Sequence, residues 1–389
     1  MAEKLPLRLA VYLDDTYREH AGGVYGNRSF VLFLGSVAER IEHLLLLGRL
    51  DPAETRSHYR VPESVEFAPL PPYPSLVHFG PALAGMLRSL RRFWRLLDEV
   101  DAVWLLGPHP LALAFALMAA LRRRRVALGV RQDWPTLVRN RHPGRRWVHL
   151  AADLLEGAYR LLSRRCPTVA VGPQVAGNYG RARHLLEISV SLVSGEDVVE
   201  PQPRPWGGRV LSVGRLDAEK NPLLLAEILR RLVDAGGDWK LTICGEGPLE
   251  DALRERLREL GVEERAELPG YLPLHGGLLD LYRSSDALLH VSLTEGLPQI
   301  LLEAFAAGLP VVATAVGGVP GAVGDAGLLV PPADAGAAAA ALERLGGDQD
   351  LRERLSRAGL ERVRGRTLEA ESARVAEFLA AGAAGRPAG

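Results

Sequence analysis

Short apolar runs alternate with longer amphipathic stretches along the first half of the chain. Runs typical of buried strands lie at residues 7–12, 41–47, 65–70, 103–106, 126–130, 168–171 and 188–193. Stretches with helical spacing of apolar positions lie at residues 27–38, 87–97, 111–121 and 147–164. Because strands that alternate with helices form βαβ units, this pattern predicts an α/β domain with a parallel sheet.

The alternation restarts beyond a proline-rich stretch that contains Pro201, Pro203 and Pro205. Apolar runs follow at residues 210–213, 241–244, 266–268 and 286–292, with helices predicted to begin at Pro222 and Pro248. A chain of 389 residues exceeds one typical core. We therefore predict a first domain over residues 1–200, a second domain over 206–368, and a final helix with a flexible tail over 369–389. One alternative packs that helix back on the first domain, and ligands are expected between the two domains.

Composition restricts the class of protein. The chain is 47% hydrophobic and 24% charged with a net charge of zero, which argues against bulk nucleic-acid binding. Its two cysteines are too few for a disulfide framework. We find neither a secretory signal nor an uncharged apolar run of the ~18 residues that a membrane span requires. A cytoplasmic enzyme is the expectation.

Two carboxylates, Glu295 and Glu303, lie eight positions apart across a predicted strand, loop and helix start. Gly296 and Pro298 supply the turn, so Glu295 is expected to end a strand and Glu303 to lie on a helix. Free backbone N–H groups at such a junction attract anions, and carboxylates beside them accept hydrogen bonds from sugar hydroxyls. The alternative is that Glu295 caps the helix and Glu303 is a solvated surface residue.

A second segment, residues 213–222, places Gly214, Arg215 and Lys220 after a predicted strand. Asn221 and Pro222 have the residue types of an N-cap and a first helical position. Lys220 would then lie beside the positive end of a helix, a position that a cation avoids unless an anion is shared there. Two cations at a helix start fit a diphosphate.

Together these residues resemble the GT-B glycosyltransferases of family 4, which are retaining, nucleotide-sugar-dependent enzymes. The resemblance covers most of residues 205–365 and rests on Arg215 with Lys220, the glutamate pair, and glycine turns at 245–248, 269–271 and 317–320. It implies a GT-B fold, in which two Rossmann-like β/α/β domains face each other across a cleft, with residues 1–200 as the acceptor-binding domain and 206–368 as the donor-binding domain.

The resemblance also implies roles for individual residues. Arg215 and Lys220 would bind the donor diphosphate, Glu295 the donor sugar, and Glu303 the ribose. Main-chain groups of Gly270 and Tyr271 would contact the base, and the amides of Gly296 and Leu297 would contact the distal phosphate. Gly22 and Gly23, in a predicted strand, glycine loop and helix unit, resemble the glycine loop near phosphate and acceptor.

One position departs from the family. Many members have a histidine after the strand that ends here at Val130, where this chain has Arg131, Gln132 and Asp133. Either Gln132 or Asp133 takes its place, or His109, one strand earlier, faces the same cleft. A lone histidine such as His109 is more often structural than catalytic.

The predicted reaction transfers a sugar with retention from a nucleoside diphosphate, with a UDP-sugar favoured over GDP-mannose. The Arg215 and Lys220 cations would stabilise the leaving group, so no metal is required. Asp348 and Asp350, the D-x-D match, have the spacing of a helix cap. The acceptor, a sugar, lipid-linked or small molecule, is unidentified. A nucleotide-sugar epimerase and a non-catalytic nucleotide-sugar sensor remain as alternatives.

Arginines gather in the N-terminal half, where residues 1–205 contain 27 Lys+Arg against 20 Asp+Glu. Arg88, Arg91, Arg92 and Arg95 lie on the helix predicted at 87–97, and residues 122–125 are four consecutive arginines. With Phe93 and Trp94, that helix suits a peripheral position on the anionic inner face of a membrane. The alternative is a solvated helix whose aromatic residues lie in the core.

Overall fold

The computed structural model describes residues 3–52, 58–73, 79–142, 144–201 and 204–384. The chain divides into two compact units, residues 1–190 with 368–389 and residues 191–367. The first unit therefore ends ten residues earlier than residue 200 and includes a helix from the end of the chain. Part of the proline-rich stretch, residues 202–203, and the predicted tail from residue 385 lie outside the described residues.

The first unit has one sheet, which among the described residues contains nine strands. They are β1 (Leu5–His20), β2 (Gly23–Gly26), β3 (Ile41–Leu50), β4 (Tyr59–Arg60), β5 (Glu66–Leu70), β6 (Ala102–Gly107), β7 (Arg125–Val130), β8 (Pro167–Val171) and β9 (His184–Ile188). β1 pairs in parallel with β3 on one side and β6 on the other. β5 extends the sheet beyond β3, and β7, β8 and β9 extend it beyond β6, all in parallel.

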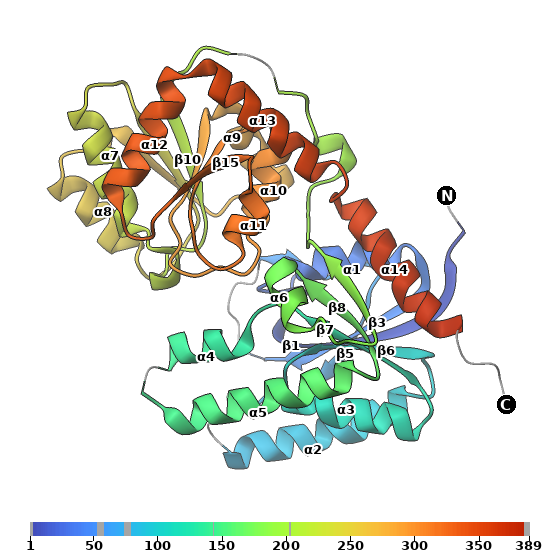
Figure 1. The fold of residues 1–389 in the computed structure, drawn as a ribbon. Helices are drawn as coiled ribbons and strands as arrows, with labels where there is room; N and C mark the ends of the chain where they lie inside the picture. Colours follow the sequence, from blue (N-terminus) through green and yellow to red (C-terminus); the bar gives the residue numbers. More distant parts are fainter. Residues whose placement is uncertain (1–2, 53–57, 74–78, 143, 202–203, 385–389) are drawn as a thin grey trace. The chain divides into compact units, whose positions relative to one another are not determined.

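Helices cover both faces of this sheet (Figure 1). On one face α2 (Phe79–Leu96), α3 (Pro110–Leu121) and α5 (Arg146–Ser163) share a single core that includes Phe93, Phe115 and Tyr159. On the other face α1 (Phe30–Ala38) packs against α14 (Leu368–Ala384). The hydroxyls of Ser36 and Ser372 join these two helices by a hydrogen bond of 2.8 Å. α4 (Trp134–Arg141) packs against α5, and α6 (Pro173–Asn178) follows β8.

Two predictions for this unit are wrong. β1 continues past residue 12 to His20 and turns back through β2 as an antiparallel hairpin, so Gly22 and Gly23 do not form a loop between a strand and a helix. Ladder hydrogen bonds hold the polar end of β1 in a strand that hydropathy alone does not indicate. The run 188–193 is apolar because Val190, Leu192 and Val193 are buried, yet the strand there ends at Ile188.

The second unit has a parallel sheet in the order β12-β11-β10-β13-β14-β15. Its strands are β10 (Arg209–Val213), β11 (Lys240–Cys244), β12 (Ala266–Gly270), β13 (Ala287–His290), β14 (Val311–Thr314) and β15 (Gly327–Val330). The chain moves outward from β10 to β12, then returns and places β13 on the other side of β10. Such a reversal is where open α/β sheets bind ligands, outside the carboxyl ends of the strands.

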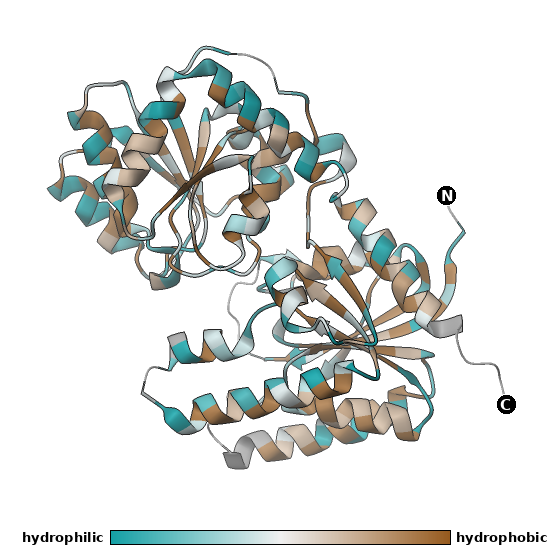
Figure 2. Ribbon diagram, in the orientation of Figure 1, coloured by the Kyte–Doolittle hydropathy of each residue, from teal (hydrophilic) through white to brown (hydrophobic). Residues whose placement is uncertain are grey.

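Two cores cover the two faces of this sheet. α7 (Leu223–Asp234), α8 (Glu250–Glu259) and α12 (Ala335–Gly347) bury one face, and α9 (Leu279–Ser284), α10 (Gln299–Ala306) and α11 (Val319–Val323) bury the other. α13 (Gln349–Val363) contributes to both. Adjacent residues such as Leu288 and Leu289 belong to opposite cores, which is why most positions of the central strands are apolar and much of this sheet is brown in Figure 2.

Candidate functional site

An ion pair joins the two loops that follow β10 and β13, at the point where the strand order reverses. Lys220 Nζ donates to Glu295 Oε1, and the Ser292 hydroxyl donates to the same oxygen at 2.9 Å. The backbone N–H of Leu293 also donates to the Glu219 carbonyl at 2.9 Å, which ties the loops together. The Lys220 side chain is 23% exposed and that of Glu295 10%, so both reach solvent. Two residues separated by 75 positions therefore meet in one accessible cluster.

His290, the last residue of β13, completes this cluster and is absent from the predicted site. Its side chain is 4% exposed, and Nε2 lies 3.4 Å from Glu295 Oε1 without a hydrogen-bond partner among the described residues. Burial lowers the pKa of His290 to about 4, and Lys220 adds to this, whereas Glu295 opposes it. The imidazole is therefore neutral near pH 7. A polar residue inside an apolar strand run was the available signal.

Arg215 lies in the same loop as Lys220 but on its outer side. Its side chain is 62% exposed and pairs with Asp217 and Glu219. The predicted helix cap is wrong: Asn221 has a left-handed backbone with φ 53°, and Pro222 occupies the N-cap of α7 without a side-chain hydrogen bond. Asn tolerates that conformation better than other non-glycine residues. The side chain that caps here is Asp217, which accepts from the Lys220 N–H and holds Lys220 in a short 3-10 turn.

Glu303 is a buried residue of α10, which overturns the surface alternative. The residue is 6% exposed, and Tyr282 of α9 donates its hydroxyl to Glu303 Oε2 at 2.8 Å. Burial raises the pKa of Glu303 to about 7, although the Tyr282 hydrogen bond and His275 lower it. A carboxyl that titrates near neutrality in this position is unusual for a structural residue. Tyr282, the hydrogen-bond partner of Glu303, is a second residue that sequence reasoning missed, since in the sequence it looks like an ordinary core aromatic residue.

Glycines let neighbouring loops touch the backbone around this cluster. A Cβ on Gly317 would lie 1.9 Å from the Glu295 carbonyl oxygen, and one on Gly318 2.0 Å from that of Gly296. Similarly, a Cβ on Gly245 would lie 1.8 Å from the Gly214 carbonyl oxygen. No side chain fits at such distances. These glycines are therefore required by the positions of the loops that carry Glu295 and Arg215.

The remaining predicted donor residues follow neighbouring strands. Gly270 ends β12 with φ 79°, and the N–H of Tyr271 lies 3.5 Å from Glu246 Oε1 in the turn after β11. Glu295, Gly296 and Leu297 lie in the loop after β13 rather than at the strand end, and Pro298 is the N-cap of α10. The end of β12 and the loops after β10, β12 and β13 therefore carry all the predicted donor residues except Glu303, which lies on α10.

The residues predicted for the acceptor side all lie in the first unit. Gly22 has φ 72° in the turn between β1 and β2, and Gly23 begins β2. His109 is 4% exposed and is the N-cap of α3, where Nδ1 accepts from the Leu111 N–H at 3.2 Å. Asp133 is the N-cap of α4 and accepts from the Thr136 N–H, and Gln132 precedes it in the same loop.

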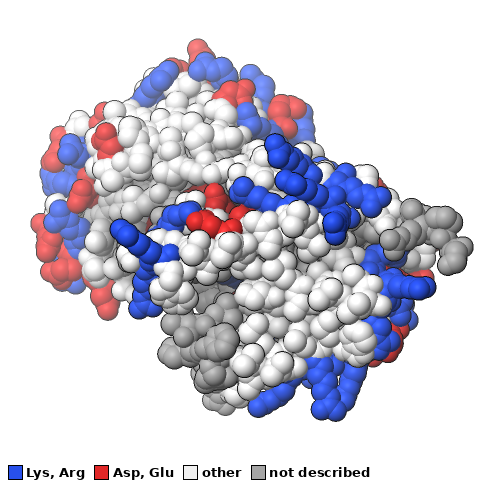
Figure 3. Space-filling view, turned by 60° about the horizontal axis from the view of Figure 1, so that its bottom comes forward, with Lys and Arg blue, Asp and Glu red and all other residues white. Residues whose placement is uncertain are grey.

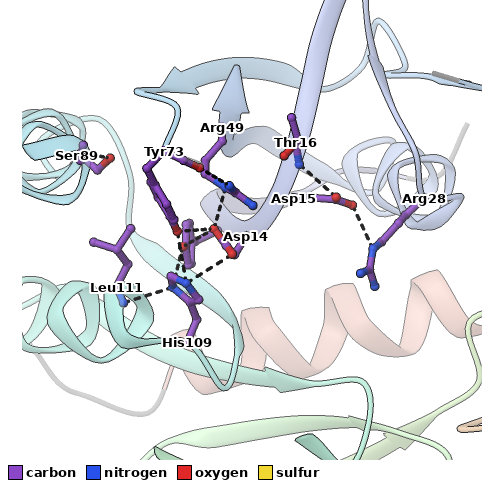
Figure 4. Close-up of polar contacts among 11 residues, drawn as sticks. Asp14, Asp15, Thr16, Arg28, Arg49, Tyr73, Ser89, His109 and Leu111 are labelled. Atoms are coloured by element: carbon purple, nitrogen blue, oxygen red, sulfur yellow. Dashed lines mark hydrogen bonds and ion pairs between the residues drawn. The ribbon is translucent and has the colours of Figure 1, made fainter. Parts of the chain in front are cut away.

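His109 belongs to a polar network centred on Asp14, which lies within β1 beside the carboxyl ends of β3 and β6 (Figure 4). The Tyr73 hydroxyl donates to Asp14 Oδ1 at 2.7 Å, Arg49 Nε lies 3.0 Å from the same oxygen, and His109 Nε2 lies 3.3 Å from Oδ2. Burial alone would raise the pKa of Asp14, but His109, Arg49 and the tyrosine hydrogen bonds hold it below its usual range. Burial lowers the pKa of His109, consistent with a neutral ring that accepts at Nδ1.

Asp348 is the N-cap of α13 and accepts from the Leu351 N–H at 2.8 Å, which confirms capping as its role. The described residues contain no group of three His, Cys, Asp or Glu side chains placed to hold a metal ion. None of the described helices is long and apolar enough to cross a membrane.

The fold is GT-B, with two α/β units built on mainly parallel sheets. HepE from Anabaena, solved in complex with UDP, superimposes with a TM-score of 0.69 over 96% of this chain and 100% of its own, at 16% sequence identity. Residues 205–362 match the family model described as "Glycosyl transferases group 1". This part of the chain is therefore a group 1 glycosyltransferase domain.

The first curated relatives match less than half of the chain. The chain is 35% identical over 168 residues to the putative colanic acid biosynthesis glycosyltransferase WcaL of Escherichia coli K12, covering 39% of this chain and 40% of that protein. It thus spans less than half the length of the first curated relatives. A longer match, 32% identical over 320 residues, covers 76% of this chain and 63% of the D-inositol 3-phosphate glycosyltransferase of Nocardia farcinica.

Proposed function

We propose that this protein is a retaining glycosyltransferase of family 4 that moves a sugar from a nucleoside-diphosphate donor to an acceptor. The observation that carries the proposal is the cluster of Lys220, Glu295 and His290 where the strand order of the second unit reverses. It combines a cation, a carboxylate and an unpartnered imidazole at an edge where such sheets bind ligands. The group 1 match over residues 205–362 supports the same reaction class.

Arg215 and Lys220 are proposed to bind the donor diphosphate. In the ligand-free chain each cation is held by carboxylates, Lys220 by Glu295 and Arg215 by Asp217 and Glu219. A diphosphate would draw both cations toward itself and loosen these pairs. Their charges would stabilise the leaving group as its bond to the sugar lengthens, a contribution of several kcal/mol in preorganised sites, about 3 kcal/mol per donor. The proposed reaction therefore requires no divalent metal.

Glu295 is proposed to hold the donor sugar once Lys220 turns to the diphosphate. Its Oε1 already accepts from Ser292, which would keep the carboxylate in position after the lysine moves. No covalent nucleophile is assigned. In the proposed same-face substitution the departing phosphate takes the proton of the acceptor hydroxyl.

Glu303 is proposed to accept hydrogen bonds from the ribose hydroxyls through the carboxylate oxygen that Tyr282 leaves available. Tyr282 binds Oε2, and an ionised Glu303 has further acceptor positions. Ribose is common to all nucleotide donors, so this residue would not select the base. A UDP-sugar is the favoured donor and GDP-mannose the second, with the base near Gly270 and Tyr271.

The acceptor is proposed to bind through the first unit and to be a glycan, a lipid-linked sugar or a small molecule. Among the relatives, WcaL is named for colanic acid biosynthesis and the Nocardia farcinica protein for transfer to D-inositol 3-phosphate. His109 is buried and Asp133 caps α4, which favours Gln132 of the three alternatives as the residue that faces an acceptor.

The test starts from a panel of nucleotide sugars scored by thermal shift, because ligand at 100 times its Kd adds about 2.7 kcal/mol of stability. Donors that stabilise the protein are then incubated with candidate acceptors, and the product is analysed by mass and by anomeric configuration. Transfer with retention supports the proposal. Epimerised donor without transfer would indicate a nucleotide-sugar epimerase, and binding without turnover across the acceptor panel a sensor.

A further inference from the structure

Large apolar side chains are exposed mainly on one side of the first unit. Among the described residues eleven large hydrophobic side chains are exposed, and nine of them lie on α2, α3 and α5. These nine are Leu83, Leu87, Trp94, Leu117, Leu121, Trp147, Leu150, Leu154 and Leu161. The three helices pack on one core and cover one face of the sheet. We call this side the α2–α3–α5 face.

Helix α5 is apolar on its outer side as well as on its inner side. Its inner side buries Ala152 and Tyr159. Trp147, Leu150 and Leu154, spaced by three and four residues, form a stripe on the opposite side and are 61–66% exposed. A helix on the surface of a soluble protein normally carries polar residues there. The outer side of α5 therefore lacks the polar residues of a solvent-exposed helix, which indicates that this side contacts a partner.

Helix α2 repeats this arrangement with arginines beside the apolar stripe. Leu83, Leu87 and Trp94 lie in one line along the helix, and Arg88, Arg91 and Arg95, all exposed, lie next to it. Arg122, at the end of α3, places its guanidinium 4.4 Å from the centre of the Trp94 ring. Phe93 is in the core but Trp94 is exposed, so the two aromatics predicted together have different environments.

Residues 79–165 carry an excess of positive charge. Residues 79–165 contain sixteen arginines and no lysine, against six acidic residues. The acidic side chains Asp98, Asp153 and Glu156 are each paired with an arginine, Asp98 with Arg122, Asp153 with Arg139 of α4, and Glu156 with Arg160. Figure 3, turned so that this side comes forward, shows a broad surface without charged residues and Lys or Arg at its margins.

We propose that the α2–α3–α5 face docks on an anionic lipid bilayer, with the leucine and tryptophan stripes of α2 and α5 entering the interface and the arginines binding lipid phosphates. Apolar residues flanked by basic ones are the arrangement that holds amphipathic helices at a bilayer surface. Trp147, at the start of α5, has the position and chemistry of an interfacial anchor.

Charge favours a bilayer over a second copy of this chain as the occupant. Two such faces brought together would each carry an excess of four positive charges on the three helices themselves, six arginines against Asp153 and Glu156, and like charges repel. An anionic bilayer satisfies both the apolar stripes and the arginines. The inference concerns binding and is independent of the proposed sugar transfer.

The experiment is sedimentation of the full chain with phosphatidylcholine vesicles that contain or lack phosphatidylglycerol. We expect binding only with phosphatidylglycerol, weakened by salt, together with a blue shift of tryptophan emission. The double variant L150N/L154N should lower the partition coefficient about tenfold, and each of R91Q and R95Q about fivefold. W147F should reduce the blue shift while vesicles still sediment the protein.

Matched controls lie in the second unit. L329N removes an exposed leucine, and R354Q and R357Q remove exposed arginines, so all three should leave vesicle binding unchanged. Melting temperature checks the fold of each variant. Absence of binding at low salt would overturn the proposal, and so would binding that the α5 variant leaves intact. Concentration-dependent dimers that L150N/L154N abolishes, without vesicle binding, would assign the face to a second copy.

Discussion

Each unit contains a polar cluster beside the central strands of its sheet, and the two clusters differ in how their histidines, His109 and His290, are hydrogen-bonded. Around Asp14 in the first unit, Tyr73, Arg49 and His109 all direct hydrogen bonds or charge to one carboxylate. Around Glu295 in the second unit, His290 Nε2 is buried without a hydrogen-bond partner among the described residues. Both ring nitrogens of His109 have partners, whereas His290 Nε2 has none; Arg49 Nε in the first cluster is also buried without a hydrogen bond among the described residues.

We interpret the second cluster as a binding site because its unpaired His290 Nε2 lies beside an ion pair, Lys220 with Glu295, that reaches solvent. A satisfied network fixes the loops that contribute to it and strengthens with each additional bond. An unpaired buried group costs free energy and persists where it serves another purpose, such as binding a ligand. Burial raises the pKa of Glu303, in the second unit, to about 7, and this also indicates a binding site there. The comparison predicts that changes in the first unit act on stability and those in the second on catalysis.

The largest expected effect is on stability in the first unit. Asp14→Asn removes the charge that holds three partners, and we expect a loss of about 3 kcal/mol in the free energy of unfolding, measured with denaturant. The dissociation constant for UDP should not change. Asp98→Asn, which breaks an exposed pair with Arg122, should cost less than about 1 kcal/mol. A change in UDP affinity without a change in stability would break the comparison.

Next comes Glu295→Ala, which should lower kcat for sugar transfer about 100-fold with an unchanged melting temperature. The sugar must be held in one orientation while positive charge develops at its anomeric carbon, and a hydrogen bond to a charged group contributes about 1.5–3 kcal/mol. Glu267→Ala, at an exposed position of β12, is the control. Transfer at the wild-type rate would show that Glu295 does not bind the donor sugar.

The effect of Glu303 on stability should depend on pH. Its pKa in the folded state is about 7 against a usual 4.5, so stability that is fully present below pH 4.5 is lost as the pH rises through 7. Glu303→Gln should therefore gain about 2 kcal/mol relative to wild type between pH 5 and pH 8. Denaturant unfolding at both pH values measures this. A constant difference would mean that Glu303 does not titrate near neutrality.

The smallest effect expected is on donor affinity. Glu303→Ala should raise KM for the donor about tenfold with little change in kcat, because ribose is bound equally in ground and transition states. Steady-state kinetics at pH 8, where Glu303 is ionised, provides the comparison with Glu295→Ala. Equal losses of kcat in both variants would remove the distinction between a ribose and a sugar residue.

Sequence patterns predicted most elements of both sheets, because most positions of parallel strands that are buried on both faces are apolar. They failed in two kinds of segment: polar residues that pair in a strand, and buried residues that lie outside any strand. The polar half of β1 is held by ladder partners, and residues 189–193 are buried beyond the end of β9. The predicted domain boundary was placed at the proline-rich stretch, whereas the contacts that define the two units change at residue 190.

For the site, the two loops were predicted from Lys220 and Glu295, because turn residues and charges mark the loops. Their direct contact was not predicted, since it depends on the strand order that places β10 beside β13. His290 and Tyr282 were missed because each lies in an apolar segment. A single polar group in such a segment does not indicate a function until its partner in the fold is known. The stripe on α5 was missed because exposure cannot be obtained from periodicity when both sides of a helix are apolar.

The most direct test of the central claim, that the second unit binds a nucleoside diphosphate at Lys220, is calorimetric titration of UDP and GDP in EDTA. We expect UDP to bind wild type without metal, and Lys220→Ala to weaken that binding at least about tenfold through loss of a charge-assisted contact. Lys240→Ala, at the opposite end of β11, should bind as wild type does. Binding that vanishes on chelation, or that Lys220→Ala leaves unchanged for both nucleotides, would contradict the account.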